Sequence, residues 1–138
     1  MGMSIEISEQ EREGIEILDL KGRLTFGQED LTLREEVEKL VRENKTKVVV
    51  NLGELHQIDT AGFGTLRYAQ DQLQAAGGGL ALAGLTPVHI EVLMACRLGV
   101  EFRTFEDDLE AVNSFFPGRE VHHFDVLKFV KSKTPQGE

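Results

Sequence analysis

Polar and apolar residues alternate with a period of two near the start of the chain. Isoleucine alternates with polar residues in two runs, Ser4–Ser8 and Gly14–Leu20, and this period is typical of half-exposed strands. The link between the runs, Glu9–Glu13, has the length of an antiparallel turn. We therefore predict a hairpin of two strands, which the segment Lys21–Arg23 ends.

Short apolar runs and helical patterns alternate over the following residues. In the first helical pattern, Leu33, Val37 and Leu40 fall on one face together with Val41, as the period of an amphipathic helix requires. Three glycines, Gly77–Gly79, end the next helix, and no Gly-Lys-Ser/Thr sequence follows that would make them a phosphate loop. The predicted elements after the hairpin are helix Glu29–Asn44, strand Lys47–Leu52, helix Gly62–Ala76, strand Leu80–Ala83, a helix from Thr86 to about Leu98, strand Glu101–Phe105 and helix Asp107–Phe116.

This order, β-β-α-β-α-β-α-β-α, decides the fold class. Repeated strand–helix–strand units need right-handed crossovers, which place their strands parallel in one sheet. We predict an α/β fold in which a small, mixed, mostly parallel sheet carries about four helices. In the last of these helices, Leu109, Val112, Phe115 and Phe116 are available for burial, and a Pro-Gly pair stops it.

The tail of the chain differs in character from the predicted domain, residues 1–116. Its apolar residues recur at every third position, namely Val121, Phe124, Leu127 and Val130. This spacing predicts a short amphipathic helix in the C-terminal extension, residues 117–138. We expect the extension to dock on the domain or to form a homodimer with a second subunit. Its end, Lys133–Glu138, is polar and contains proline and glycine, so we expect it to be disordered.

Composition and charge limit the class of partner. The 138 residues are 41% hydrophobic and 28% charged, which is ordinary for a soluble domain. No apolar run approaches the ~20 residues that cross a bilayer, and the start lacks the features of a signal peptide, so we expect a cytoplasmic protein without membrane insertion. The net charge of −9 argues against binding to nucleic acid or an anionic membrane, and it leaves open a partner with a basic face.

No cluster of residues indicates catalysis. The carboxylates fall mostly on predicted helix surfaces, and no pair is marked out as a general acid and base. His122 and His123, near Asp125, are weak metal-ligand candidates because adjacent side chains on a short helix point in different directions. The single cysteine, Cys96, excludes an internal disulfide and lies in an apolar run, as a core residue does. We therefore predict neither an enzyme nor a bound cofactor or metal.

The strongest candidate site is the junction between a buried strand and the following helix. Its residues are Ile58, Asp59, Thr60, Ala61, Gly62, Phe63 and Gly64. A hydroxyl at a helix N-terminus, here that of Thr60, is a common cap worth ~1 kcal/mol. Free N–H groups and the helix dipole also favour a phosphate there, so both interpretations stay open. Gly62 and Gly64 are expected to keep the approach to Thr60 free of side chains, and Phe63 is either an exposed contact or a core residue.

The strand Val48–Leu52, the junction Ile58–Gly64 and the following helix resemble the STAS domain. This is the family of bacterial anti-sigma factor antagonists, found also at the ends of sulfate transporters, with the signature Asp-Ser-Ser/Thr-Gly-Leu-Gly at the start of a helix. The resemblance covers roughly residues 4–116 and includes the early turn Leu20-x-Gly22-x-Leu24. The chain departs from the family in having Thr60 where serine is usual, and Thr25 where the early turn usually carries aspartate.

The resemblance implies a function as well as a fold. In the family, the unphosphorylated antagonist binds an anti-sigma factor that is a serine-kinase-like ATPase, and so frees the sigma factor. The kinase phosphorylates the hydroxyl residue directly after the aspartate, which is Thr60 here, and the complex falls apart. By the same resemblance, Asp59 and the residues Ala61, Gly62, Phe63 and Gly64 are expected to contact the partner.

A second interpretation rests on the same residues. STAS subunits of lipid-transport ABC systems resemble this chain in having Asp-Thr-Ala-Gly, the sequence of Asp59–Gly62. In those subunits the threonine contacts the ATPase subunit, and no phosphorylation is needed. The longer amino-terminal hairpin and the acidic helix Glu29–Asn44 favour the anti-sigma factor antagonist.

Overall fold

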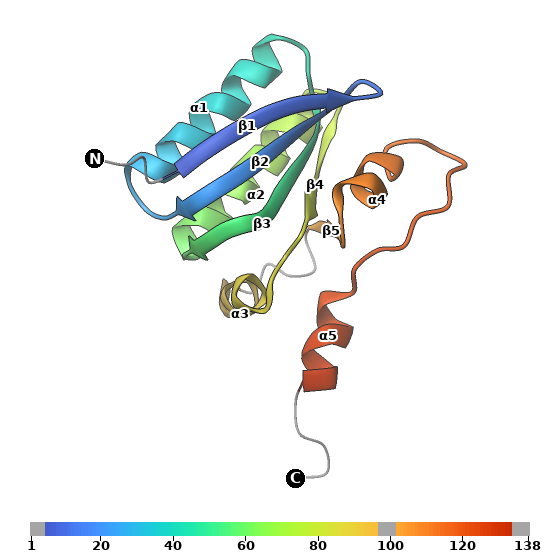
Figure 1. The fold of residues 1–138 in the computed structure, drawn as a ribbon. Helices are drawn as coiled ribbons and strands as arrows, with labels where there is room; N and C mark the ends of the chain where they lie inside the picture. Colours follow the sequence, from blue (N-terminus) through green and yellow to red (C-terminus); the bar gives the residue numbers. More distant parts are fainter. Residues whose placement is uncertain (1–4, 97–101, 134–138) are drawn as a thin grey trace.

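The computed structural model describes residues 5–96 and 102–133 (Figure 1). Its strands and helices follow one another in the predicted order, and the helix of the C-terminal extension comes last. The strands are β1 (Ile5–Arg12), β2 (Ile15–Leu24), β3 (Lys47–Ile58), β4 (Gly79–Ala83) and β5 (Arg103–Phe105). The helices are α1 (Gln28–Arg42), α2 (Thr60–Ala75), α3 (Pro87–Cys96), α4 (Asp108–Asn113) and α5 (Val126–Lys133). The predicted end of the third helix near Leu98 and the predicted start of the last strand at Glu101 lie outside the described residues.

The five strands form one mixed sheet in the order β1-β2-β3-β4-β5. Only the β1–β2 pair is antiparallel, and the other three pairs are parallel, which confirms the predicted fold class. The hairpin turn lies later than predicted, because β1 continues to Arg12, which pairs with Ile15. Glu13 and Gly14 form the turn with φ values of 55° and 85°, the left-handed conformation that matches the twist of a two-residue hairpin.

Two strands are longer than the sequence pattern indicated. β2 passes through Gly22 to Leu24 instead of ending at Lys21–Arg23, and shifts in its register with β3 absorb the irregularity. Gly22 has a φ of 101°, which a bulged strand accommodates when the residue is glycine. β3 runs on to Ile58, which pairs with Leu24. The two strands therefore end side by side, and the segments that follow them start next to each other.

Helices cover both faces of the sheet (Figure 1). α1 and α2 contact each other and pack on one face, whereas α4 packs on the other face beside Ile15 and Phe105. The predicted inner face of α1 is confirmed, because Leu33, Val37 and Leu40 are buried. No helix in the described part of the chain is long and apolar enough to cross a membrane.

The last helix of the domain is shorter than predicted, and one of its apolar residues faces solvent. α4 begins after Asp107, whose carboxylate accepts the N–H of Glu110 at 3.0 Å. Ala111 and Val112 are buried, but Leu109 is 51% exposed. Leu109 precedes Ala111 by two residues, which is about 200° around a helix, so the expectation of its burial was wrong.

The C-terminal extension returns to the free edge of β5. The Phe124 N–H donates to the Thr104 carbonyl at 2.7 Å, and the Thr104 hydroxyl donates to the Phe124 carbonyl at 2.6 Å. Val126, the first residue of α5, is buried in the same cluster as Phe63. The extension thus packs on its own domain. Lys133, expected to begin a disordered end, belongs to α5, and residues 134–138 lie outside the described residues.

Candidate functional site

The junction between β3 and α2 is capped by Asp59. Its backbone is extended, with φ −117° and ψ −175°, and its Oδ1 accepts the N–H of Gly62 at 2.8 Å. The Asp59 N–H donates to the Leu24 carbonyl at 3.4 Å, so the same residue also joins the end of β2. A carboxylate satisfies a free N–H and complements the positive end of the helix dipole. The interpretation of Thr60 as the cap was therefore wrong.

Thr60 is the first helical residue and is exposed. Its hydroxyl takes part in no hydrogen bond with the described residues, because Asp59 already serves as the cap. An exposed hydroxyl without an internal role is free to contact another protein or to accept a phosphoryl group. The sequence left open whether Thr60 caps the helix or accepts a phosphate. Because Asp59 is the cap, the Thr60 hydroxyl is left available for the second role.

Asp59 uses its second carboxylate oxygen to hold the loop between β2 and α1. Oδ2 accepts the N–H of Phe26 at 3.1 Å, so one side chain binds two segments far apart in the sequence. The Phe26 side chain is 81% exposed. Beside it, the Thr25 hydroxyl donates to Glu29 Oε1 at 2.9 Å. Thr25 therefore stabilises the first turn of α1.

The two glycines of the junction have different roles. Gly62 is buried, and a Cβ atom there would lie 2.7 Å from Ile58 Cγ1 and closer still to the Leu24 carbonyl. Gly62 is therefore required by the packing of α2 on the end of β2. Gly64 is exposed, and a Cβ atom there would meet nothing within 4 Å. Only Gly64 keeps the surface near Thr60 open, so the expectation for Gly62 was wrong.

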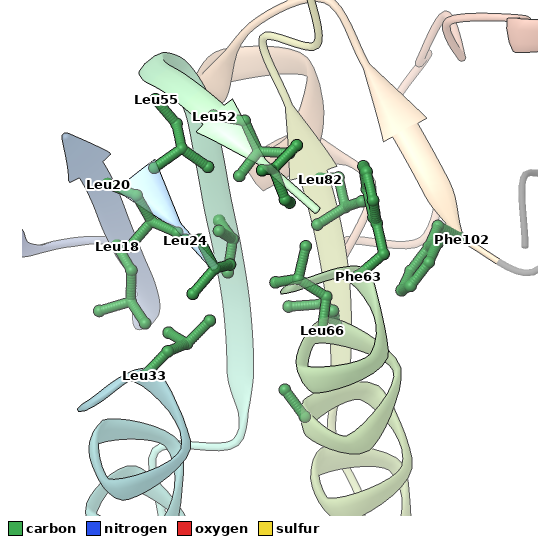
Figure 2. Close-up of a cluster of buried hydrophobic side chains, with 14 of the residues drawn as sticks. Leu18, Leu20, Leu24, Leu33, Leu52, Leu55, Phe63, Leu66, Leu82 and Phe102 are labelled. Carbon is green, nitrogen blue, oxygen red and sulfur yellow. The ribbon is translucent and has the colours of Figure 1, made fainter. Parts of the chain in front are cut away.

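Phe63 is a core residue and not an exposed contact. Its side chain is 0% exposed, and its ring centroid lies 6.4 Å from that of Phe102. Figure 2 shows the Phe63 ring beside Leu82 and Phe102, in the cluster that also contains Leu66. Phe63 and Leu66 are three residues apart and so share the face of α2 that meets the sheet. The interpretation of Phe63 as an exposed partner contact was therefore wrong. At the junction, Thr60 and Gly64 are exposed to solvent and Ala61 is half-buried.

Burial shifts the pKa of two neighbouring titratable side chains, Cys96 and His89. Burial, and then the charge of Asp59, raise the pKa of the half-buried Cys96 thiol, which keeps it protonated. Burial also lowers the pKa of His89, whose Nδ1 accepts the Thr86 N–H at 3.0 Å while Nε2 contacts the Leu55 carbonyl. A neutral His89 thus ties α3 to β3. Within the described residues, no three His, Cys, Asp or Glu side chains converge as metal ligands.

Phe26 lies beside the junction and was not identified from the sequence. It comes directly before Gly27, whose φ of 116° and ψ of −129° favour glycine. An aromatic residue next to such a glycine, outside every predicted element, was the available signal. Its position beside the junction depends on a hydrogen bond to a residue 33 positions away, and no local pattern shows this.

Comparison with known proteins identifies the domain. The family model of the STAS domain matches residues 6–111. A candidate anti-sigma factor antagonist from Thermotoga maritima superimposes with a TM-score of 0.73 at 16% identity, over 79% of this chain and 93% of that one. A search of curated proteins found no match.

The anti-sigma factor antagonist SpoIIAA is similar to the chain in two solved forms. Its unphosphorylated form gives a TM-score of 0.67 at 18% identity, over 79% of this chain and 95% of that one. The phosphorylated form of the Bacillus protein gives a TM-score of 0.61 at 18% identity, over 79% and 98% of the two chains. At these identities the likeness establishes the fold.

Proposed function

This chain belongs to the STAS domain family, and from that premise we propose that it is a bacterial, cytoplasmic anti-sigma factor antagonist. It binds a serine-kinase-type anti-sigma factor through the surface around Thr60, and phosphorylation of Thr60 ends the complex. The observation that carries this proposal is the exposed Thr60 hydroxyl, left without a partner among the described residues because Asp59 caps the helix. The similarity to an antagonist known in unphosphorylated and phosphorylated forms supports it.

Electrostatics explains how one phosphate can act as the switch. A phosphate adds about −1.5 to −2 charges at neutral pH. In the free protein it stays hydrated at the end of α2. In a packed complex it loses that hydration beside the Asp59 carboxylate, which already occupies the Gly62 N–H. A loss of a few kcal/mol at the interface weakens binding by orders of magnitude.

Phosphoryl transfer to Thr60 tests this proposal. Incubation with a kinase-type anti-sigma factor from the same organism and ATP is expected to add one phosphate, seen by intact mass and mapped to Thr60 by peptide fragmentation. Thr60→Ser keeps a hydroxyl at the position and should still be modified, whereas Thr60→Ala should gain no mass. An unmodified wild-type protein after treatment with every such kinase of the organism would falsify the phosphorylation switch.

The same exposed hydroxyl also suits a STAS subunit of a lipid-transport ABC system. In that case Thr60 contributes a contact, and substitution by alanine weakens binding as much as substitution by glutamate. In the antagonist, Thr60→Glu weakens binding to the anti-sigma factor whereas Thr60→Ala leaves it nearly unchanged. The two candidates are therefore separated by measuring both variants against the ATPase subunit and the anti-sigma factor.

A further inference from the structure

Phe26 is the most exposed large apolar side chain among the described residues, at 81%. Two hydrogen bonds nevertheless hold its loop. Asp59 Oδ2 accepts the Phe26 N–H at 3.1 Å, and the Thr25 hydroxyl donates to Glu29 Oε1 at 2.9 Å. An aromatic ring on a rigid loop loses little conformational freedom when it binds, which is the property of an interface hot spot.

We propose that Phe26 is an apolar anchor of the partner interface and that Asp59 is the positioning residue that holds it beside Thr60. The inference rests on the proposed function for its occupant, the kinase-type anti-sigma factor that receives Thr60. This partner then carries an apolar pocket for Phe26 next to the site that receives the Thr60 hydroxyl. Basic groups around that pocket complement the net charge of −9.

The two oxygens of Asp59 make the positioning role testable. Oδ1 caps α2 through the Gly62 N–H, and Oδ2 holds the Phe26 N–H. Asparagine caps helices as well as aspartate does, but its carboxamide has only one acceptor oxygen. Asp59→Asn therefore retains one of the two hydrogen bonds and loses the other, so the helix cap and the fixed loop cannot both be kept.

Photo-crosslinking tests whether Phe26 faces the partner. The aromatic crosslinker p-benzoylphenylalanine is placed at position 26, at position 64 beside Thr60, or at position 109 in the full-length protein, in cells of the source organism. Leu109 is the matched control, because it is 51% exposed but lies on α4, on the opposite face of the sheet. Positions 26 and 64 should capture the same protein, and position 109 should not.

Failure at position 26 overturns the anchor, whether position 64 captures a protein or not. The identity of the captured protein tests the proposed function separately. If it is not a kinase-type anti-sigma factor, the proposed function fails while the anchor stands.

Affinities measured with the captured, purified protein test the link between Asp59 and Phe26. Phe26→Ala should weaken binding about tenfold or more, as expected for a hot spot, whereas Leu109→Ala should change it less than about twofold. Asp59→Asn should also weaken binding, but the double variant should bind no more weakly than Phe26→Ala alone. Additive losses would show that Asp59 does not act through Phe26, and an unchanged affinity of Phe26→Ala would show that the ring is no anchor.

Discussion

Gly62 and Gly64 lie two residues apart in α2, and the same methyl group is expected to have opposite effects at the two positions. Gly64→Ala should stabilise the protein by roughly 0.5–1 kcal/mol, because alanine favours the helix and the added Cβ meets nothing. Gly62→Ala should destabilise it by about 1–3 kcal/mol, because the Cβ overlaps Leu24 and Ile58. Urea unfolding of both variants measures the difference.

The Gly64→Ala variant also tests the proposed binding surface. If the surface at Gly64 packs closely against the partner, Gly64→Ala should weaken binding even though it stabilises the free protein. A variant that is more stable and binds equally well would show that the partner does not approach position 64. A Gly62→Ala protein as stable as the wild type would contradict the packing described for the junction.

At the level of elements, a carboxyl cluster between the hairpin and α1 makes stability depend on pH. Glu16 on β2 is 4% exposed, and Lys39 on α1 lies 3.6 Å from Glu9 and 3.6 Å from Glu36. Burial, and then a hydrogen bond with Glu9, raise the pKa of Glu16, and the same causes raise the pKa of Glu36. Burial acts to raise the pKa of Glu9, but hydrogen bonds from these two groups and the charge of Lys39 together lower it.

Glu16→Gln should therefore stabilise the protein at pH 7. A carboxyl with a raised folded-state pKa destabilises the fold above that pKa, and the penalty disappears as the pH falls towards its ordinary value of 4.5. The gain from Glu16→Gln should shrink over the same range. Unfolding midpoints measured between pH 7 and pH 4 check this, and a loss of stability at pH 7 would contradict it.

Glu13→Gln is the matched substitution with the opposite sign. A hydrogen bond from Arg119 lowers the pKa of Glu13, and the two side chains meet at 2.8 Å and 3.2 Å. The pair stabilises the fold above the ordinary pKa of Glu13, and this contribution is lost as the pH falls through the lowered value. Glu13→Gln should thus reduce stability at pH 7 and should make no difference in acid. The reduction should be small because the Glu13–Arg119 pair is exposed.

The extension offers a pair of adjacent residues with different burial. Val126 is 5% exposed within the cluster that holds Phe63, and Leu127 is 46% exposed. Val126→Ala should cost about 1–3 kcal/mol, and Leu127→Ala less than about 0.5 kcal/mol, in thermal or urea unfolding. If α5 instead packs on a second subunit, Leu127→Ala should change the molecular mass of the particle in solution, and Val126→Ala should leave the stability unaltered.

At the level of the whole molecule, the sequence predicted what depends on local periodicity. The alternation of strand and helix patterns sufficed for the order of elements and the mixed sheet. The buried face of α1 was predicted because Leu33, Val37 and Leu40 recur with the helical period. The sequence prediction ended β2 too early. The strand continues through a bulge at Gly22 because it pairs with β3, which is distant in the sequence.

The candidate site was found in part for the same reason. The acid and hydroxyl of the junction are adjacent, so the sequence located them, but their roles depend on three-dimensional contacts. Asp59 became the cap and Thr60 the free hydroxyl only once the backbone was known. The burial of Phe63 depends on Phe102, and the place of Phe26 depends on Asp59. Neither contact leaves a pattern along the chain.

The central claim is that one phosphate on Thr60 separates this protein from a kinase-type anti-sigma factor. Its most direct test is the affinity of the purified pair, measured by calorimetry with the antagonist unmodified and with Thr60 fully phosphorylated. We predict tight binding of the unmodified protein and a loss of about hundredfold or more after phosphorylation, which corresponds to a few kcal/mol. Equal affinities of the two forms would contradict the account.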